Sequence, residues 1–176
     1  MIGLAALVLA CSEEKRYTMQ SPEIETVKAV FERYNAGDLE GQKQYYADGA
    51  QIFNNVPESK PSTIDQVIEQ QKSDSEGISS YNAEIQDDAI EMVVTDKGET
   101  WVNAWGVWTG TMAATNQTFE IPFHVTYRFV DGKIFREHGY WDNTNIVMAF
   151  MEYEAAQKAS ADTIPLDHQI VGLKGQ

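Results

Sequence analysis

The feature that most constrains the fold of this chain is the stretch 119–142, in which two segments of alternating polar and apolar residues flank Val130-Asp131-Gly132-Lys133. Alternation with a period of two is typical of a strand that buries one face. Asp-Gly is a common pair at the tip of a β-hairpin. The stretch therefore predicts two antiparallel strands, and their register decides which side chains share a face.

Two registers are compatible with this turn. If Asp131-Gly132 formed a two-residue turn, Tyr127 would face Arg136, and both faces of the hairpin would mix apolar with charged residues. A three-residue loop with Gly132 in the left-handed conformation as a bulge separates the two kinds, so we expect the bulged loop. The pairs that it predicts are Tyr127 with Phe135, Val125 with Glu137, Phe123 with Gly139, Ile121 with Trp141 and His124 with His138.

In that register one face of the hairpin is apolar and holds a single carboxylate, Glu137. The apolar members of this face are Ile121, Phe123, Val125, Tyr127, Phe135 and Trp141. The opposite face carries His124, Thr126, Arg128, Arg136 and His138. A face of aromatic rings around one acid is either a packed core or the wall of a pocket.

Length and charge limit the class of protein. The 176 residues suit a single domain, and a hydrophobic fraction of 43% is enough for one packed core. Lysine and arginine number 13 against 27 aspartate and glutamate residues, a net charge of -14. This charge repels a phosphate backbone, so no nucleic-acid partner is expected. The only notable apolar run, 1–10, is too short to span a bilayer as a helix.

This apolar run ends at Cys11, the only cysteine, and a mostly charged segment follows at 12–16. Val8-Leu9-Ala10-Cys11 resembles the lipobox of bacterial lipoproteins, in which the signal peptide is cut before a cysteine that becomes acylated. The resemblance implies a signal segment over 1–10, a lipidated Cys11 and a tether over 11–21. It also implies a location in the bacterial cell envelope, at the outer membrane or the surface. A buried N-terminal strand with a structural thiol is the alternative.

The remaining chain is helical first and then extended. Ser21-Pro22-Glu23 is a helix start, and Gly37 ends the apolar repeat of three and four residues that follows it. From Tyr81 the apolar period changes to two. The elements expected are helices at 22–36, 39–46, from 62 and at 145–158, and strands at 50–54, 81–94, 99–112 and the two arms of the hairpin. Helices followed by a long antiparallel sheet indicate an α+β fold.

Four short segments carry a resemblance that covers residues 22–153. They are Tyr34-Asn35-Ala36-Gly37-Asp38-Leu39-Glu40, Tyr46-Ala47-Asp48-Gly49-Ala50, Phe129-Val130-Asp131-Gly132-Lys133-Ile134 and Tyr140-Trp141-Asp142. Together they resemble the nuclear transport factor 2-like or SnoaL-like superfamily. The resemblance implies a cone-shaped, curved antiparallel sheet with the N-terminal helices on its concave face, in a domain over 22–160 that precedes a tail over 161–176. The fold hosts several enzyme classes as well as domains without chemistry, so it does not imply one activity.

The catalytic residues of the superfamily do not transfer intact. The resemblance places the tyrosine and the two acids of ketosteroid isomerases at Val30, Asn54 and Val125. It places the acid that SnoaL-like cyclases and limonene epoxide hydrolases carry in the last strand at Gly139. The missing acids favour a binding module.

Glu137 is the candidate catalytic residue, since burial among rings raises the pKa of a carboxyl and poises it as a general acid or base. A glutamate that only satisfies the core is the alternative. The residues expected to line a ligand pocket with it are Phe53, Asn54, Asn103, Trp105, Phe123, Tyr127, Phe135 and Trp141. No cofactor is implied.

No metal site is expected on the polar face. The pair His124 and His138 lacks the third and fourth ligands that zinc needs, and Arg128 and Arg136 would repel a cation. Sheets of the resembled superfamily often dimerise through this face, so the resemblance implies a homodimer there. Asp142 precedes the last helix and is expected to cap it.

Three functions remain open. The first is a lipid-anchored envelope domain whose apolar pocket binds a small hydrophobic or aromatic molecule. The second is a small lyase, isomerase or hydrolase that uses Glu137 as acid or base. The third is a non-catalytic interaction domain with a filled core. A cavity distinguishes them, since ligand pockets usually have a volume of roughly 300 Å³ or more.

Overall fold

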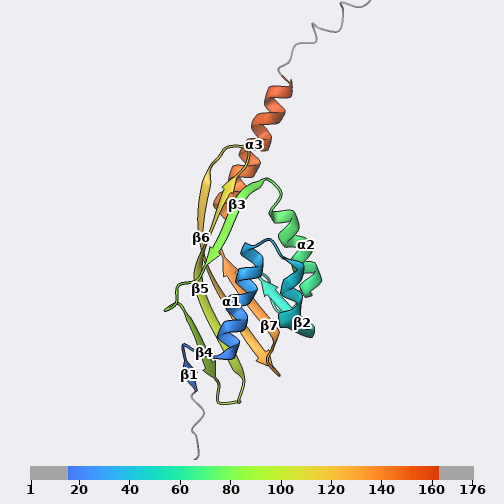
Figure 1. Ribbon diagram of the computed structural model, residues 1–176. Coiled ribbons are helices and arrows are strands. Elements are labelled where there is room, and N and C mark those ends of the chain that lie inside the picture. Colours follow the sequence, from blue (N-terminus) through green and yellow to red (C-terminus); the bar gives the residue numbers. More distant parts are fainter. Residues whose placement is uncertain (1–15, 163–176) are drawn as a thin grey trace, which may run out of the picture.

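The computed structural model describes residues 16–162 (Figure 1). The expected signal segment, Cys11 and the tail beyond 162 lie outside the described residues. The helices are α1 (Pro22–Asn35), the 3₁₀ helix η1 (Glu40–Tyr45), α2 (Ile64–Asp74) and α3 (Thr144–Asp162). The strands are β1 (Tyr17–Thr18), β2 (Tyr46–Asn54), β3 (Ile78–Glu84), β4 (Ile90–Val94), β5 (Thr100–Met112), β6 (Thr118–Val130) and β7 (Lys133–Trp141).

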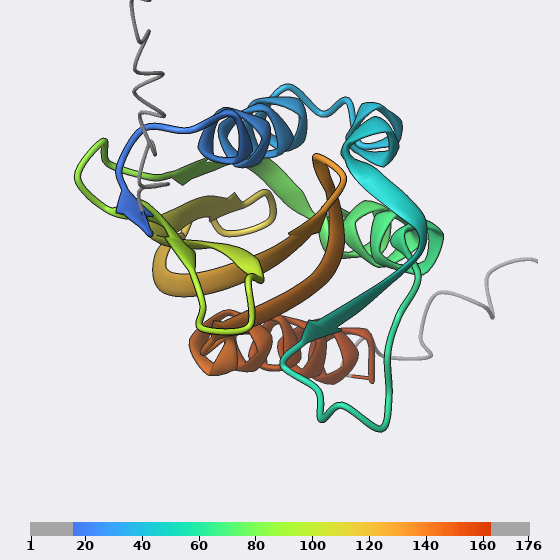
Figure 2. The same cartoon turned by 90° about the horizontal axis from the view of Figure 1, so that it is seen from below.

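The strands of the described part form one 7-stranded sheet in the order β1-β4-β5-β6-β7-β2, and β3 pairs with the half of β5 that β4 leaves free. β2 and β7 are parallel, and the other pairs are antiparallel. The sheet bends around α1, while α3 lies on the opposite side (Figure 2). We call the face toward α1 the inner face and the other the outer face. The predicted α+β fold with a curved sheet is confirmed.

The helix α1 covers the inner face. The Ser21 hydroxyl caps it by accepting a hydrogen bond from the Ile24 N–H at 3.2 Å. Gly37, with a φ of +71°, follows its end. Ile24, Val27 and Val30 share one side of the helix and are buried. None of the helices within residues 16–162 is long and apolar enough to cross a membrane.

Two elements differ from the expected ones. The segment 39–46 is the 3₁₀ helix η1, and Tyr46 already begins β2. The expected strand 81–94 is divided into β3 and β4, which pair with different halves of β5. A turn separates them, in which the Ala89 N–H donates to the Gln86 carbonyl at 2.9 Å. The intervening Asp87 and Asp88 belong to a residue type that favours turns.

The hairpin of β6 and β7 does not have the expected register. Asp131 and Gly132 have φ of +50° and +74°, and Val130 pairs with Lys133. Positive φ at both central residues defines the two-residue type I′ turn, whose twist matches that of the flanking strands. The expected three-residue loop and its pairs are therefore wrong. The observed pairs are Tyr127 with Glu137, Val125 with Gly139, Phe123 with Trp141, His124 with Tyr140 and Thr126 with His138.

The two faces are nevertheless separated, and a bulge explains why. The register shifts between Arg128 and Phe129, where β7 contains one extra residue, Phe135. The turn moves the pairing by one residue from the expected register, and the bulge moves it by one more. A shift of two leaves each side chain beyond the bulge on its face. Phe135 changes sides, and the Arg128 guanidinium lies over its ring at 5.9 Å.

The core lies between α1 and the inner face. Its buried members are Ile24, Val27, Val30, Ala83, Ile90, Val102, Ala104, Phe123, Val125, Tyr127, Phe129 and Ile134. Among the described residues, Gln42 and Glu137 are the polar or charged residues that are buried. Gln42 donates to Gln71 at 2.9 Å. Glu137 is thus the one buried carboxylate in this part of the chain.

Candidate active site

Glu137 lies in the middle of β7 on the inner face and is 6% exposed. Tyr46, at the start of β2, donates its hydroxyl to Glu137 Oε2 at 2.6 Å. The side-chain amide of Asn54, at the end of β2, hydrogen-bonds to the same carboxyl group. Tyr127 lies directly opposite Glu137 on β6. Three strands thus place two phenols and one amide around a buried acid.

The surroundings shift the pKa of each acidic group in this cluster. Burial raises the pKa of Glu137, and the hydrogen bonds from Tyr46 and Asn54 partly oppose the rise. Burial also raises the pKa of Tyr46 and Tyr127 well above the usual value, and the charge of Glu137 adds to both shifts. Both phenols therefore stay protonated at neutral pH. The carboxyl group is the member that can take up and release a proton.

Aromatic rings share the inner face and the adjoining side of α1 with the cluster. Phe123 and Trp141 pair across β6 and β7. Phe31 of α1 stacks on Phe123, with ring centroids 5.4 Å apart. Farther along α1, the Trp108 indole N–H donates to the Tyr34 hydroxyl at 3.0 Å, and burial raises the pKa of Tyr34 to about 12. These rings belong to or pack against the same core as Tyr127, and burial in such apolar surroundings strengthens electrostatic interactions at Glu137.

The structure brings half of the predicted pocket residues to Glu137. Those on the inner face are Asn54, Phe123, Tyr127 and Trp141. Phe53, Asn103, Trp105 and Phe135 lie on the outer face, so their expected place beside Glu137 is corrected. Alternation is the reason for Phe53, Asn103 and Trp105, because Ile52, Val102 and Ala104 occupy the inner face at neighbouring positions. Phe135 lies on the outer face because it is the extra residue of the bulge.

Each of the four outer residues has its own contacts. Phe53 stacks on His138 with ring centroids 4.8 Å apart, and Trp105 stacks on His124 at 4.9 Å. Asn103 accepts a hydrogen bond from the Thr126 hydroxyl at 2.7 Å. Phe135 lies beneath the Arg128 guanidinium.

Sequence reasoning missed Tyr46 as a site residue. It entered only through the segment Tyr46-Ala47-Asp48-Gly49-Ala50 that pointed to the fold. Its hydroxyl meets a carboxylate 91 residues away because β2 runs parallel to β7. No local pattern in the sequence reports that pairing.

The histidines of the outer face do not pair as expected. His124 lies opposite Tyr140, and His138 lies opposite Thr126. Burial lowers the pKa of both, and Arg136 lowers that of His138 further. Residues 16–162 contain no group of three or more His, Cys, Asp or Glu that could hold a metal ion.

Asp142 lies at the start of α3 rather than in the cluster. Its carboxylate accepts a hydrogen bond from the Thr144 N–H at 2.9 Å, and the hydrogen bonds from the Thr144 hydroxyl and N–H lower the pKa of Asp142. The residue therefore serves the helix start, as its place in the sequence suggested.

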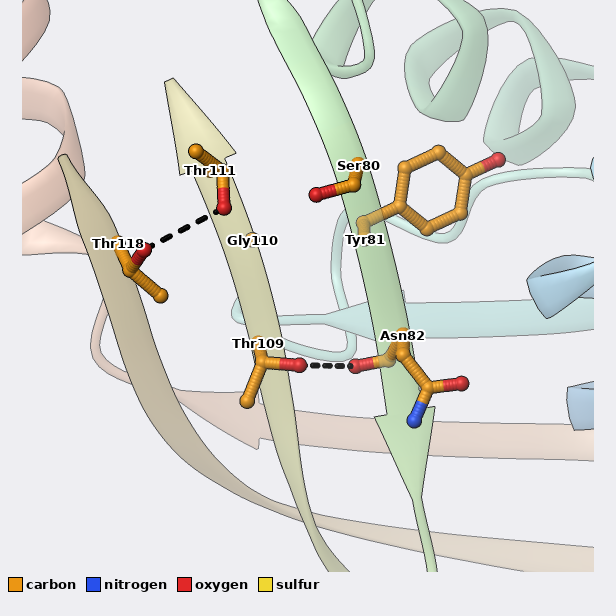
Figure 3. A pocket seen from close by; sticks show the side chains of 7 residues that line it. All are labelled: Ser80, Tyr81, Asn82, Thr109, Gly110, Thr111 and Thr118. Carbon is orange, nitrogen blue, oxygen red and sulfur yellow. Dashed lines mark hydrogen bonds between the residues drawn. The ribbon is translucent and has the colours of Figure 1, made fainter. Parts of the chain in front are cut away.

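Two shallow hollows lie away from Glu137. The first, of about 170 Å³, is lined by Ser80, Tyr81, Asn82, Thr109, Gly110, Thr111 and Thr118. Figure 3 shows the Thr111 and Thr118 hydroxyls pointing toward each other. The Tyr81 ring lies on the side of β3 that is turned away from these two hydroxyls. The second, of about 300 Å³, is lined by Glu84, Gln86, Gly106, Val107, Thr109 and Glu120. Neither hollow includes a residue of the Glu137 cluster.

Comparisons with known proteins agree with the fold. IdmH of Streptomyces antibioticus, a proposed polyketide cyclase, is 22% identical, with a TM-score of 0.57 over 73% of this chain and 97% of its own. A proposed polyketide cyclase of Xanthomonas campestris is 19% identical, with a TM-score of 0.57 over 74% and 98%. A proposed isomerase of Bacillus subtilis is 15% identical, with a TM-score of 0.55 over 76% and 95%. A search of curated proteins finds no match.

A family model described as the SnoaL-like domain matches residues 27–137. The match begins in α1 and ends in β7, and so it includes most of the curved sheet. It covers more than half of the chain, which is therefore a member of the SnoaL-like family.

Proposed function

We propose that this domain is a small lyase, isomerase or hydrolase in which Glu137 transfers a proton to or from a bound organic molecule. The observation that carries the proposal is the Tyr46 hydroxyl at 2.6 Å from the only buried carboxylate of the described residues. A carboxyl group whose pKa is raised by burial is a stronger base once ionised and a usable acid while protonated. The cyclase and isomerase assignments of two structural neighbours are consistent with such chemistry.

The named residues have distinct roles in this proposal. Glu137 holds the moving proton. Tyr46 stabilises the ionised carboxylate by donating a hydrogen bond to it, and the neutral Tyr127 lies opposite Glu137 on β6. The Trp141 ring, which lies beside Asn54, limits the access of water to the reacting group.

A base-sensitive probe tests the proposal without knowledge of the natural substrate. When a base removes the C3 proton of 5-nitrobenzisoxazole, the N–O bond breaks and a coloured nitrophenolate is released. The wild-type protein should accelerate this elimination about 100-fold over Glu137→Gln, the lower end of the usual range of general acid–base catalysis. The rate should rise with pH as Glu137 ionises.

Glu120→Gln is the matched control, because Glu120 is an exposed carboxylate on the outer side of β6. It should keep the wild-type rate. A wild-type rate in Glu137→Gln would rule out Glu137 as the base.

The second candidate is a lipid-anchored domain that binds a small apolar molecule without converting it. Val30 and Val125, where the ketosteroid isomerases carry acid–base groups, are both buried apolar residues, and this observation favours binding. Native mass spectrometry of the detergent-extracted full-length protein tests it. A co-purifying small molecule, together with no elimination activity, would favour binding over catalysis.

The anchor is a separate part of that proposal. It rests on the apolar run that ends at the only cysteine. Cys11→Ser should move the protein from the membrane fraction to the soluble fraction. Membrane association that persists in this variant, with no mass change after globomycin treatment, would contradict it.

An interaction role at the outer face is the third candidate. Trp105 and Tyr140 are large side chains with 44% and 53% exposure there, as a homodimer contact would require. Trp105→Glu should dissociate a dimer in sedimentation experiments. Tyr17→Glu, at an exposed residue of the short edge strand β1, should not. A wild-type protein that sediments as a monomer would contradict this proposal.

A further inference from the structure

Hydrogen bonds of Asn55 connect the end of β2 to the end of β7. Its side-chain amide donates to the Trp141 carbonyl at 3.0 Å, and its Oδ1 accepts from the Trp141 N–H at 3.1 Å. Its own N–H donates to the Gly139 carbonyl at 2.9 Å. Asn55 adopts a φ of +53°, a conformation that asparagine tolerates better than most residues. The preceding residue, Asn54, is therefore held in place beside β7.

Asn54 occupies the space above Gly139. A Cβ atom added to Gly139 would lie 2.4 Å from Asn54 Oδ1 and 2.6 Å from the Trp141 ring. A side chain at position 139 would collide with both groups. The missing side chain thus allows Asn54 to reach over β7 toward Glu137.

The side-chain amide of Asn54 uses only part of its hydrogen-bonding capacity within the described residues. It hydrogen-bonds to Glu137, but its Oδ1 is buried, and no donor among the described residues reaches that oxygen. A buried acceptor without a donor is unfavourable, and most such groups in proteins are satisfied. The oxygen lies beside Trp141, a partly exposed ring. A bound molecule that displaces this ring would gain access to it.

We infer that Asn54 is a second ligand-binding group of the site and that it accepts a hydrogen bond from a hydroxyl or N–H group of the bound molecule. The ligand class is therefore a small, mainly apolar molecule with one hydrogen-bond donor next to the carbon that exchanges its proton with Glu137. This inference rests on the proposed function of Glu137 and names the ligand chemistry of the same site.

Phenol and anisole test the inference, because they have similar ring area and differ in the O–H donor. Binding is measured by titration of the full-length protein, observed by NMR. The wild-type protein should bind phenol about five to ten times more tightly than anisole, as one added hydrogen bond predicts. Asn54→Leu should lose this preference. Asn82→Leu, a matched change at an exposed position on β3, should keep it.

A second readout needs no variant. In the wild-type protein, phenol should shift the Asn54 side-chain amide resonances, and anisole should leave them in place. Equal affinity for the two probes, or a phenol preference that survives Asn54→Leu, would overturn the inference. Glu137→Gln should keep the phenol preference while losing the elimination activity. The two measurements therefore separate failure of the Asn54 inference from failure of the proposed function.

Discussion

At the scale of single residues, the unusual feature is a carboxyl group placed in an apolar core. The pKa of Glu137 is raised by burial, so the folded protein binds this proton more tightly than the unfolded chain. The stabilisation that the proton provides is fully present below the unfolded pKa of about 4.3. It is lost as the pH rises from that value through the pKa of the folded state.

Glu137→Gln should therefore change stability in a pH-dependent way. At pH 4 both side chains are neutral, and the melting temperatures should be similar. At pH 8 the variant should melt several degrees above the wild-type protein, because no buried charge has to form. Each unit of pKa difference corresponds to about 1.4 kcal/mol. Circular dichroism melts from pH 4 to 8 provide the measurement, and a difference that does not vary with pH would contradict the prediction.

At the scale of elements, the β6–β7 hairpin combines a tight turn with a bulge. Together these two features keep most apolar side chains of β6 and β7 on the inner face, although neither would do so alone. Within this arrangement, the backbone conformation at Gly132 is the feature that most requires a particular residue type. Its φ is +74°, and no atom lies within 4 Å of an added Cβ.

Gly132→Ala should destabilise the protein by about 1–2 kcal/mol, the usual cost of the left-handed conformation for a residue with a Cβ. Because the added methyl group meets no neighbour, the loss would come from the backbone alone. Asp131→Asn is the control and should be nearly neutral, since asparagine suits a type I′ turn. Urea unfolding measures both variants. An unchanged Gly132→Ala protein would contradict the turn assignment.

At the scale of the whole molecule, a net charge of -14 opposes compaction. Ion pairs of the described residues, such as Arg16 with Asp96 and Lys72 with Glu69, have mostly exposed side chains. Exposed pairs contribute little, and salt screens them as well. The repulsion among unpaired acids should therefore dominate the response to salt.

Raising the NaCl concentration from about 20 to 200 mM should increase the melting temperature at pH 7, since the Debye length falls below about 10 Å. The same change at pH 4.5, where the protein is near its pI of about 4.5, should have a smaller effect. A decrease at pH 7 would show that the ion pairs outweigh the repulsion.

Local chemistry was enough to predict much of this molecule. The Ser21 cap and the apolar repeat identified α1, and alternation identified the long strands. Alternation also placed Phe123, Val125 and Tyr127 on one face of β6, because side chains along a strand alternate whatever its partner. Glu137 of β7 was assigned to that face by the expected register, and it lies there because the observed register differs from the expected one by two residues. The exact register was missed, since the sequence pattern does not distinguish a bulge in the loop from a bulge one pair beyond the turn.

Which residues of separate strands meet one another depends on long-range contacts that the sequence pattern does not contain. Alternation relates Phe53 to Asn54 but does not say which of them meets the core, and the predicted pocket therefore mixed residues of both faces. The sequence by itself determined the main helices, the long strands and the separation of apolar from charged side chains in the hairpin, because these follow from periodicity. Only the tertiary structure placed Tyr46 and Asn54 on Glu137, because that contact requires the parallel pairing of β2 with β7 across most of the chain.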